Sequence, residues 1–456
     1  MDKVIAAIRA AADRQRAELF ELLSIPSISA DPAHKPDVQR AAQWLLAKLQ
    51  GMGIRSEVVP TPGHGIVYGE HLATEGAPTV LLYGHYDVQP VDPLNLWTTP
   101  PFEPTIRDGK VFARGSSDDK GQVLCHLLAI EAFMEATGGL PVNLKIVIEG
   151  EEEVGSPNLT PFVEASRERL ACDAVMVSDS AFFAKGVPSI VYGLRGLAYM
   201  EVIAHGPNRD LHSGSYGGAV ANPADALAGM IAALHDEDRR IAVPGFYDKV
   251  RQLTPAEREE YTRLPHDEEA YMADLGVDGL QGEAGFSTLE RLSARPTLEV
   301  NGIWGGYMGE GAKTVLPAYA GAKISCRLVP DQDPDDIAAR VEKRLRELAP
   351  AGIRLEFVRH HGGRPYLAAP DSPFVEAGKG ALEAAFGKRP VMTREGGSIP
   401  VVEAFGRLLG APAVLMGLGL PDDNLHSPNE KLDLEQFHKG IEAAAQFMAL
   451  AGKVGR

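Results

Sequence analysis

Short apolar runs alternate with helical patterns along the first 195 residues, which predicts stacked layers of strands and helices. Residues 79–83, 142–148 and 174–177 are apolar runs bounded by glycine, proline or acidic residues, as buried strands are. Between the first two runs, residues 120–135 place apolar side chains at helical spacing, and Gly138 follows where that helix should end. The pattern is typical of an α/β fold with a mostly parallel sheet.

From about residue 192 the pattern changes. Residues 197–204 and 320–329 alternate between apolar and polar positions, which predicts an antiparallel sheet with one exposed face. We also expect strands at residues 298–303 and 354–358, helices at 222–236 and 335–348, and solvated helices within the charged residues 237–290. After residue 361 the α/β pattern returns, with a strand at residues 413–416 and a last helix at 434–451.

These changes of pattern predict two domains. Residues 1–191 and 362–456 would form the first and second parts of one α/β domain, in which helices flank a central, mostly parallel sheet. Residues 192–361 would form an inserted α+β domain. The length of 456 residues is consistent with this division, because one domain core usually takes about 150 residues.

Composition excludes several classes of protein. Hydrophobic residues make up 45% of the chain and charged residues 23%, so disordered and fibrous architectures are excluded. No apolar run approaches the roughly 20 residues that a membrane helix needs. Residues 1–21, which we expect to form one charged amphipathic helix, lack the apolar stretch of a secretory signal. We therefore expect a cytoplasmic protein without a membrane partner.

An excess of acidic residues, 62 against 45 lysines and arginines, gives the chain a net charge of −17. Such a surface repels phosphate backbones, so we expect no nucleic-acid partner. The excess is compatible with solubility alone or with a few acids that bind cations, and the total does not decide between them. Three distant cysteines, Cys125, Cys172 and Cys326, form no CxxC pair and predict reduced, buried thiols.

Histidine and acidic side chains cluster directly after the expected strands or at a helix start. Because ligands in open α/β sheets collect beyond the carboxyl ends of the strands, we expect these clusters to converge on one crevice. The clusters are GHYD at residues 84–87, RGSSDDKG at 114–121, EGEEEVGS at 149–156, Ser178 with Asp179, and His426 within PDDNLHSP at 421–428.

Each cluster also has a simpler structural explanation. A histidine near an aspartate after a strand is more often a polar contact than a metal site. Asp118 and Asp119 could place negative charge at a helix N-terminus, and the glutamates at residues 151–153 could be a solvated run. Asp179 and His426 indicate nothing individually, so the hypothesis of a functional site depends on the whole set.

As a set, the clusters supply the donors of a dinuclear metal site. Imidazole nitrogens and carboxylate oxygens suit zinc, manganese and cobalt(II), and the absence of nearby cysteines argues against a thiolate site. Two metals about 3.5–4 Å apart need a bridging carboxylate, roughly two terminal ligands each and a bound water. A further carboxylate must take the proton of that water. The adjacent Glu152 and Glu153 offer one base and one ligand.

Seven motifs, in order along essentially the whole chain, resemble the co-catalytic metallopeptidases of the aminoacylase, carboxypeptidase G and dipeptidase family. The resemblance is strongest to the branch of cytosolic non-specific dipeptidases, which are carnosine-dipeptidase-like. The motifs are GHYDVQP at residues 84–90, RGSSDDKG at 114–121, EGEEEVGS at 149–156, DLHSGSYGG at 210–218, SCRLVP at 325–330, TREGGSIP at 393–400 and DDNLHSPNEK at 422–431.

The resemblance implies two divalent ions, zinc or manganese, in each subunit. The fold that the resemblance implies is a zinc-peptidase-like catalytic domain with an inserted lid and dimerisation domain. In the family, the peptide bond that corresponds to Asp118–Asp119 is typically cis. The implied ligands are His85 and Asp179 for one ion, Glu153 and His426 for the other, and Asp118 as the bridge between them.

The resemblance also implies the catalytic and substrate-binding residues. Asp87 would orient His85, and Glu152 would be the general base that activates the water. His212 would reach into a neighbouring subunit's active site and polarise the scissile carbonyl, so the enzyme would be a homodimer paired through the inserted domain. Arg327 would clamp the C-terminal carboxylate of a small peptide substrate. Thr314, Ser398 and His426 would complete substrate binding.

Hydrolysis of a dipeptide amide bond is the activity that the resemblance implies. An N-acyl-amino-acid deacylase, a desuccinylase or a glutamate carboxypeptidase would share the same metal site. The charged residues 237–290 and the motifs at 210–218 and 325–330 favour the dipeptidase. A non-catalytic, metal-bound binding protein should have lost Glu152 or a ligand, and this chain keeps all of them.

Overall fold

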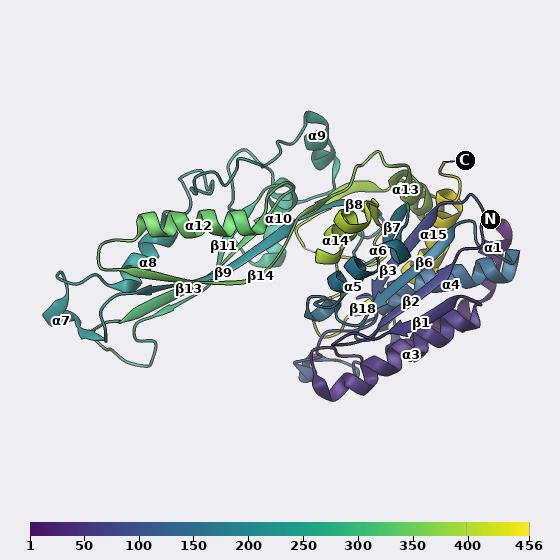
Figure 1. Ribbon diagram of the computed structural model, residues 1–456, viewed down its shortest axis with the longest axis horizontal. Coiled ribbons are helices and arrows are strands. Elements are labelled where there is room, and N and C mark those ends of the chain that lie inside the picture. The colour runs from purple at the N-terminus through teal and green to yellow at the C-terminus, as the bar shows by residue number, and fades with distance from the viewer. Residues whose placement is uncertain (398, 456) are drawn as a thin grey trace. The chain divides into compact units, whose positions relative to one another are not determined.

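The computed structural model describes residues 1–397 and 399–455, and the chain divides into two compact units (Figure 1). The first unit consists of Met1–Tyr192, Ala368–Thr393 and Val401–Arg456, and the second of Gly193–Leu367 and Arg394–Pro400. Residues 362–367 and 394–400, which the sequence pattern placed with the α/β domain, thus belong to the second unit.

The first unit is built around a sheet whose central strands are parallel. Its strand order is β1, β2, β6, β3, β7, β17, β8, and the parallel pairs are β6 with β3, β3 with β7, and β7 with β17. The four parallel strands confirm the apolar runs predicted from the sequence, because a strand that is covered on both faces is apolar throughout. The bounds are β1 Arg55–Val59, β2 Ile66–His71, β3 Thr79–His85, β6 Asn143–Glu149, β7 Ala174–Val177, β8 Ser189–Leu194 and β17 Ala413–Leu415.

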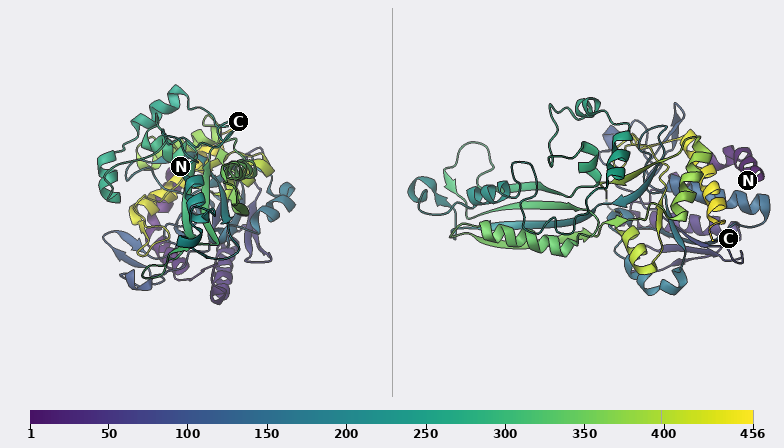
Figure 2. Two further views of the ribbon diagram at one scale, coloured as in Figure 1. Left: turned by 90° about the vertical axis from the view of Figure 1, so that its left-hand side faces the viewer. Right: turned by 90° about the horizontal axis from the view of Figure 1, so that it is seen from above.

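Helices cover both faces of this sheet, as the two views of Figure 2 show. Val80 and Leu82 of β3 face a core that they share with the helices α1 to α4, α13 and α15. On the opposite face, Tyr83 meets the ring of Phe405 in α14 edge to face at 5.4 Å. These helices are α1 Asp2–Ala10, α2 Ala12–Leu23, α3 Lys35–Gly51, α4 Lys120–Thr137, α13 Pro373–Phe386, α14 Pro400–Leu409 and α15 Leu434–Ala451. Among the described residues, no helix has the length and apolarity that crossing a bilayer requires.

The N-terminus differs from the single helix expected for residues 1–21. The chain turns at Ala11, whose φ of −95° and ψ of 8° lie outside the helical range, so α1 and α2 are separate helices. The turn lets both helices bury their own apolar side chains, such as Ile8 in α1 and Leu19 in α2, in one core.

The second unit contains an antiparallel sheet in the order β11, β13, β9, β14. Side chains of β9 alternate between buried and half-buried along the whole strand, and the buried ones pack against α8 and α12. The predicted strands and helices of this region are confirmed, although β14 continues to Gly363 with an irregular register between Arg359 and Gly362. The bounds are β9 Gly196–His205, β11 Thr297–Gly305, β13 Tyr319–Leu328, β14 Arg354–Gly363, α8 Pro223–Ala232 and α12 Pro334–Leu348.

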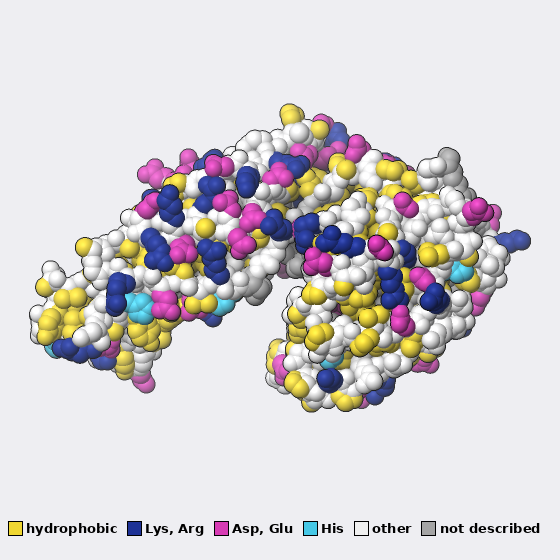
Figure 3. Space-filling model, viewed as in Figure 1, with side chains coloured by type: hydrophobic (Ala, Val, Ile, Leu, Met, Phe, Trp, Pro, Cys, Tyr) yellow, Lys and Arg dark blue, Asp and Glu magenta, His cyan; other side chains and the backbone are white. Residues whose placement is uncertain are grey.

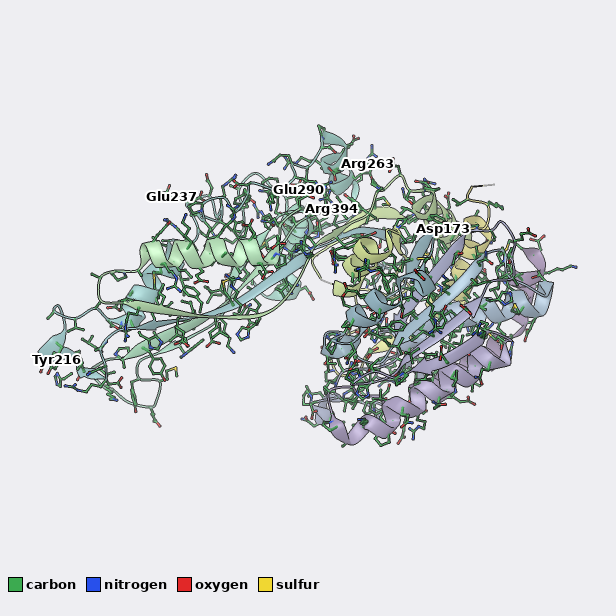
Figure 4. All side chains as sticks on the ribbon, in the orientation of Figure 1. Asp173, Tyr216, Glu237, Arg263, Glu290 and Arg394 are labelled. Atoms are coloured by element: carbon green, nitrogen blue, oxygen red, sulfur yellow. The ribbon has the colours of Figure 1, made fainter. Side chains whose placement is uncertain are left out.

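The charged segment between Glu237 and Glu290, both labelled in Figure 4, forms short helices rather than long ones. Thr254 and Ser287 begin two of them with capping boxes, in which a hydroxyl and a glutamate satisfy backbone N–H groups that the helix leaves free. Lysines, arginines and acidic side chains intermingle over the second unit in Figure 3, consistent with the ion pairs of α12. The helices are α9 Pro255–Arg263, α10 Glu268–Leu275 and α11 Thr288–Ser293.

All three cysteines are free thiols. Cys125 and Cys326 are buried as expected, whereas Cys172 is only partly buried. Burial raises the pKa of Cys326 and of Cys172 to about 12, so both remain protonated and poorly nucleophilic at neutral pH.

Candidate metal centre

The chain brings the predicted metal ligands to one edge of the first unit's sheet. His85 is the last residue of β3, and Asp179 lies two residues beyond β7. Because β3 is parallel to both β6 and β7, the ends of these strands meet at the same edge. Asp118 precedes α4, Glu153 lies in a short 3-10 turn after β6, and His426 lies in the loop between β17 and β18 (Lys431–Asp433).

The ligand atoms gather in two groups of three. His85, Glu152 and Asp179 form one group and Asp118, Glu153 and His426 the other, and within each group one donor atom per residue lies within 4.8 Å of the others. The adjacent glutamates therefore fall into different groups. This division follows from the turn that Glu152–Val154 form, in which neighbouring side chains point in different directions.

Asp118 connects the two groups. Its Oδ1 lies 3.1 Å from Nε2 of His85, and its Oδ2 lies 3.0 Å from Nε2 of His426. Nε2 of His85 is also 3.9 Å from Asp179, and Nε2 of His426 is 3.2 Å from Glu153. One carboxylate between two imidazoles, each with a further acid beside it, has the arrangement that a bridging ligand and its terminal ligands require.

Asp87 holds the turn that carries the two glutamates. Its buried carboxylate accepts hydrogen bonds from the backbone N–H of Glu152 at 3.2 Å and of Glu153 at 3.1 Å. Nδ1 of His85 lies 3.1 Å from the carbonyl oxygen of Asp87 and 3.4 Å from its Oδ1. Asp87 thus contacts His85, as the resemblance implies, and also connects the end of β3 to the turn after β6.

The electrostatics of the cluster favour the binding of a positively charged ion. Burial and the nearby acids Asp179, Glu153 and Asp118 raise the pKa of Glu152 to about 9, although His85 opposes the rise. Burial and Asp118 raise the pKa of Asp179 to about 7. Hydrogen bonds to Asp118 and Glu153 raise the pKa of His426 to about 10. Crowded carboxylates that ionise only reluctantly are stabilised by a bound cation, and the imidazole and carboxylate donors suit zinc or manganese.

Glu430, to which the sequence analysis assigned no role, organises the loop that carries Asp118. Its fully buried carboxylate accepts hydrogen bonds from the backbone N–H of Gly115 at 3.0 Å, Ser117 at 2.9 Å and Asp118 at 3.1 Å. Arg114 donates a fourth at 2.8 Å. The Asp118–Asp119 peptide bond is cis, as the resemblance implies. Glu430 and Arg114 both lie within the recognised motifs, but the pattern alone does not pair them.

A second buried carboxylate closes the loop of His426. Asp423 accepts hydrogen bonds from Nζ of Lys431 at 2.6 Å and from Oγ of Ser117 at 2.7 Å. The backbone N–H of Lys431 also donates to the carbonyl of Asp423 at 3.0 Å, so the loop that bears His426 is closed at its base. Ser117, the residue before Asp118, thus connects the loop of His426 to the loop that carries Asp118.

The predicted substrate-binding residues lie mostly in the second unit. His212 ends the short strand β10 (Leu211–His212), which pairs with β12 (Val315–Leu316), and Ser213 N–H donates to the carbonyl of Thr314 at 3.1 Å. Arg327 is half-buried in β13, and burial lowers its pKa. Ser398 lies outside the described residues. The structure thus brings together the metal-ligand candidates with Asp87 and Glu152, and separately brings His212 near Thr314.

The model of Peptidase family M20/M25/M40 matches residues 81–450 of the chain. The chain belongs to this family. The membership confirms the expectation of a metallopeptidase, a hydrolase that acts on peptide bonds, and of the family named in the sequence analysis.

Relatives and solved structures of this family cover nearly the whole chain. The Cys-Gly metallodipeptidase dug1 of Schizosaccharomyces pombe is 35% identical over an alignment 460 residues long, which covers 97% of this chain and 96% of the relative. The structure of the M20 family metallo-carboxypeptidase Sso-CP2 from Sulfolobus solfataricus matches with a TM-score of 0.85 and 35% identity, covering 96% of this chain and 99% of its own. That of human carnosine dipeptidase 1 matches with a TM-score of 0.81 and 31% identity, covering 99% of both chains. The predicted α/β fold class is confirmed.

Replacing Glu430 by glutamine tests whether this residue positions Asp118. The amide would turn an N–H₂ group toward backbone N–H donors and would leave Arg114 without its buried partner. We expect a loss of about 3–5 kcal/mol in the free energy of unfolding, together with a lower content of bound zinc or manganese. Chemical denaturation and elemental analysis of the folded variant measure the two effects.

Glu283→Gln is the matched control, because Glu283 forms a comparable buried pair with Arg295 in the second unit. It should lower stability and leave the metal content unchanged. If Glu430→Gln also kept its full metal content, Glu430 would stabilise the fold without positioning Asp118.

Proposed function

We propose that the chain is a dipeptidase that hydrolyses the amide bond of its substrate with two divalent metal ions, zinc or manganese, and with Glu152 as general base. The observation that carries this proposal is the position of Asp118 between His85 and His426, with Glu152 and Glu153 divided between the two ligand groups. The names of the relatives, Cys-Gly metallodipeptidase and carnosine dipeptidase, support a dipeptide substrate.

Five of the six residues in the two groups would hold the metals, with His85 and Asp179 on one ion, Glu153 and His426 on the other, and Asp118 between them, which leaves Glu152 as the base. Divalent ions held there would supply a Lewis acid for the peptide carbonyl and a water molecule of lowered pKa. Glu152 takes a proton from that water and returns it to the leaving amine. Asp87 sets the position of the base, because it binds the backbone N–H of Glu152.

His212 would polarise the scissile carbonyl. Its Nδ1 accepts a hydrogen bond from the backbone N–H of Gly214 at 3.0 Å, so the neutral ring carries its proton on Nε2. The exposed Nε2–H is then a donor for the oxygen on which negative charge develops. The contact with Gly214 therefore selects the tautomer that the proposed role needs.

Arg327 would bind the free carboxylate of the substrate, with Thr314, Ser398 and His426 completing the binding site. A guanidinium matches a carboxylate with two parallel hydrogen bonds, which a lysine cannot reproduce. Recognition of this carboxylate would limit the substrate to about one residue on the C-terminal side of the bond that is cleaved. An N-acetyl amino acid carries the same carboxylate, so the substrate panel below, and not the clamp, distinguishes a dipeptidase from a deacylase.

A substrate panel tests the proposed activity. Dipeptides such as Cys-Gly and β-Ala-His, tripeptides, N-acetyl amino acids and C-terminally amidated dipeptides are assayed with zinc or manganese. We expect the highest kcat/KM for dipeptides with a free carboxylate. Preference for N-acetyl amino acids would favour a deacylase instead. Preference for longer peptides would favour a carboxypeptidase, the activity named for the similar protein Sso-CP2.

The Arg327→Lys variant tests the carboxylate clamp within the same panel. Loss of the bidentate contact should lower kcat/KM for free dipeptides by about 10–100-fold, since a charge-assisted hydrogen bond contributes about 1.5–3 kcal/mol, and should change the amidated substrates little. Arg354→Lys, at an exposed arginine of β14, is the control and should behave as the unsubstituted protein. Equal hydrolysis of free and amidated dipeptides would contradict the clamp.

Separate substitutions of the adjacent glutamates test their roles. Glu152→Gln removes the base but no ligand, so it should keep both metals and lower kcat by about 10²–10⁴-fold. Glu153→Gln removes a charged ligand, so it should lower metal occupancy and regain some activity in excess metal. Metal content and kcat are measured on the same samples.

Glu151→Gln serves as the control for both variants. Glu151 is buried but accepts a hydrogen bond from Asn158 at 2.7 Å, which a glutamine oxygen can also accept, and it belongs to neither ligand group. The roles would be reversed if Glu152→Gln lost metal while Glu153→Gln kept both metals and lost activity.

We also propose that the enzyme is a homodimer paired through the second unit, in which His212 serves the active site of the other subunit. The edge strands β11 and β14 of the four-stranded sheet expose Ile303, 59% accessible, and Val358, 39% accessible. Tyr319 of β13 is 53% accessible as well. Exposed strand edges and apolar side chains favour pairing with a second copy.

Mixing two inactive variants, His212→Ala and Glu152→Gln, tests this arrangement. A mixed dimer contains one site with both an intact His212 and an intact Glu152 only if His212 acts across the interface. Random exchange should then restore about a quarter of full activity, since half of the dimers are mixed and each has one intact site. No recovery after exchange, or full activity of a monomer at high dilution, would exclude the arrangement.

A further inference from the structure

The second unit contains a cavity of about 220 Å³ that is lined by three arginines, Arg239, Arg291 and Arg295. It lies at the start of β11 and beside α11, the helix that carries Glu290 in Figure 4. No residue of the two metal-ligand groups lines it. The volume exceeds that of a few water molecules, each of which takes about 30 Å³ in the liquid.

Arg295 is a buried cation with an unused donor. Its side chain is 3% exposed, and two of its nitrogens donate to the carboxylate of Glu283, each at 2.8 Å. The guanidinium also lies over the ring of Phe286, 4.2 Å from its centroid. Its third nitrogen, Nη1, is buried without a hydrogen-bond partner. A buried N–H group without an acceptor is rare, and a ligand oxygen would satisfy it.

The other two arginines have no carboxylate partner among the residues that the structure describes. Nε of Arg291 donates to the backbone carbonyl of Glu283 at 3.0 Å, and this arginine forms no ion pair there. Arg239 forms no ion pair in the described part of the chain either, and its Nε is buried without a partner. Two guanidinium groups are therefore available to an anion that enters the cavity.

The charge of the lining favours an anion. Three arginines face two glutamates, Glu283 and Glu299, and His235 is the remaining titratable group. Burial and the neighbouring Arg239 lower the pKa of His235, so this ring is neutral at neutral pH. The lining thus carries an excess of one positive charge in a chain whose net charge is −17. A low-dielectric wall strengthens the attraction between such a lining and an anion.

We propose that this cavity is a binding site for a small oxyanion, the carboxylate or phosphate group of a metabolite. Guanidinium groups recognise both groups by paired, charge-assisted hydrogen bonds. Arg239 and Arg291 supply the free cations, and Nη1 of Arg295 supplies the buried donor. The buried pair of Arg295 and Glu283 keeps the third arginine in place before the anion binds.

An anion in the cavity would also contact β11, the strand that pairs with β13, and β13 carries Arg327. Thr297 and Glu299 of β11 line the cavity, and in the sheet they pair with Arg327 and Ser325 of β13. An anion that bridges Arg291 and Arg239 should therefore slow the local opening of β11. Slower exchange of backbone amide hydrogens in residues 297–305 is the expected signature.

Calorimetric titration of the metal-loaded full chain tests the proposal, with inorganic phosphate and succinate as probes and sodium chloride as the control for ionic strength. We expect one of the two probes to bind, and its identity distinguishes a phosphate from a carboxylate ligand. Arg239→Gln and Arg291→Gln should each weaken binding by at least about 10-fold, because each removes a charge-assisted contact. Neither substitution breaks an ion pair among the described residues, so both variants should fold.

Arg354→Gln, the exposed arginine of β14 that does not line the cavity, is the matched control and should bind the probe as the unsubstituted chain does. Unchanged affinity in both cavity variants would place the anion elsewhere, for example on the metals, and would overturn the proposal. So would an equal loss in Arg354→Gln, or the absence of binding by both probes. These measurements do not depend on hydrolysis, so they stand apart from the test of the dipeptidase activity.

Discussion

The carboxylate of Asp118 reaches His85 with one oxygen and His426 with the other, and the candidate metal centre depends on this contact. The three residues come from a loop before α4, the end of β3 and a loop near the C-terminus, so no local interaction can align them. Glu430 aligns the first by binding the backbone around Asp118, and Asp423 closes the loop of His426. The buried carboxylates of Glu430 and Asp423, each surrounded by hydrogen-bond donors, thus determine where the carboxylate of Asp118 lies.

Buried charged side chains favour the binding of cations in the first unit and of anions in the second. In the first unit, acids crowd until Glu152 and Asp179 ionise reluctantly, which makes the cluster receptive to cations. In the second unit, Arg295 is buried against Glu283, while its neighbours Arg239 and Arg291 have no acidic partner among the described residues, which favours an anion in the cavity. The net charge of −17 predicts neither feature, because binding depends on where the charges are buried and not on their sum.

Strand and helix positions were largely predictable where burial imposes a simple period. The strands β3, β6, β7 and β17 are apolar because helices cover both faces, and β9 and β13 alternate because one face is covered. The period does not indicate where a helix is interrupted, as at Ala11, because both halves have the same amphipathic pattern. Nor did it identify β1, β2 and β8. The side chains of β1, at the sheet edge, are exposed or half-buried, whereas β8 is a short buried strand that the pattern did not separate from its surroundings.

The order of motifs along the chain was sufficient to predict the family and the fold class. Strand ends and donor types are local properties, so the residues that gather in the candidate metal centre could be named from the sequence, whereas their roles as ligands or base stay predictions. Only the tertiary structure decided which residues that are distant in sequence form hydrogen bonds with each other. Glu430 meets the backbone of Ser117 across 313 positions, and Asp87 meets that of Glu152 across 65. The anion-binding cavity has no motif, since its arginines belong to a loop, a helix and the approach to a strand. Such contacts depend on how the elements pack, and a pattern of neighbouring residues does not contain that information.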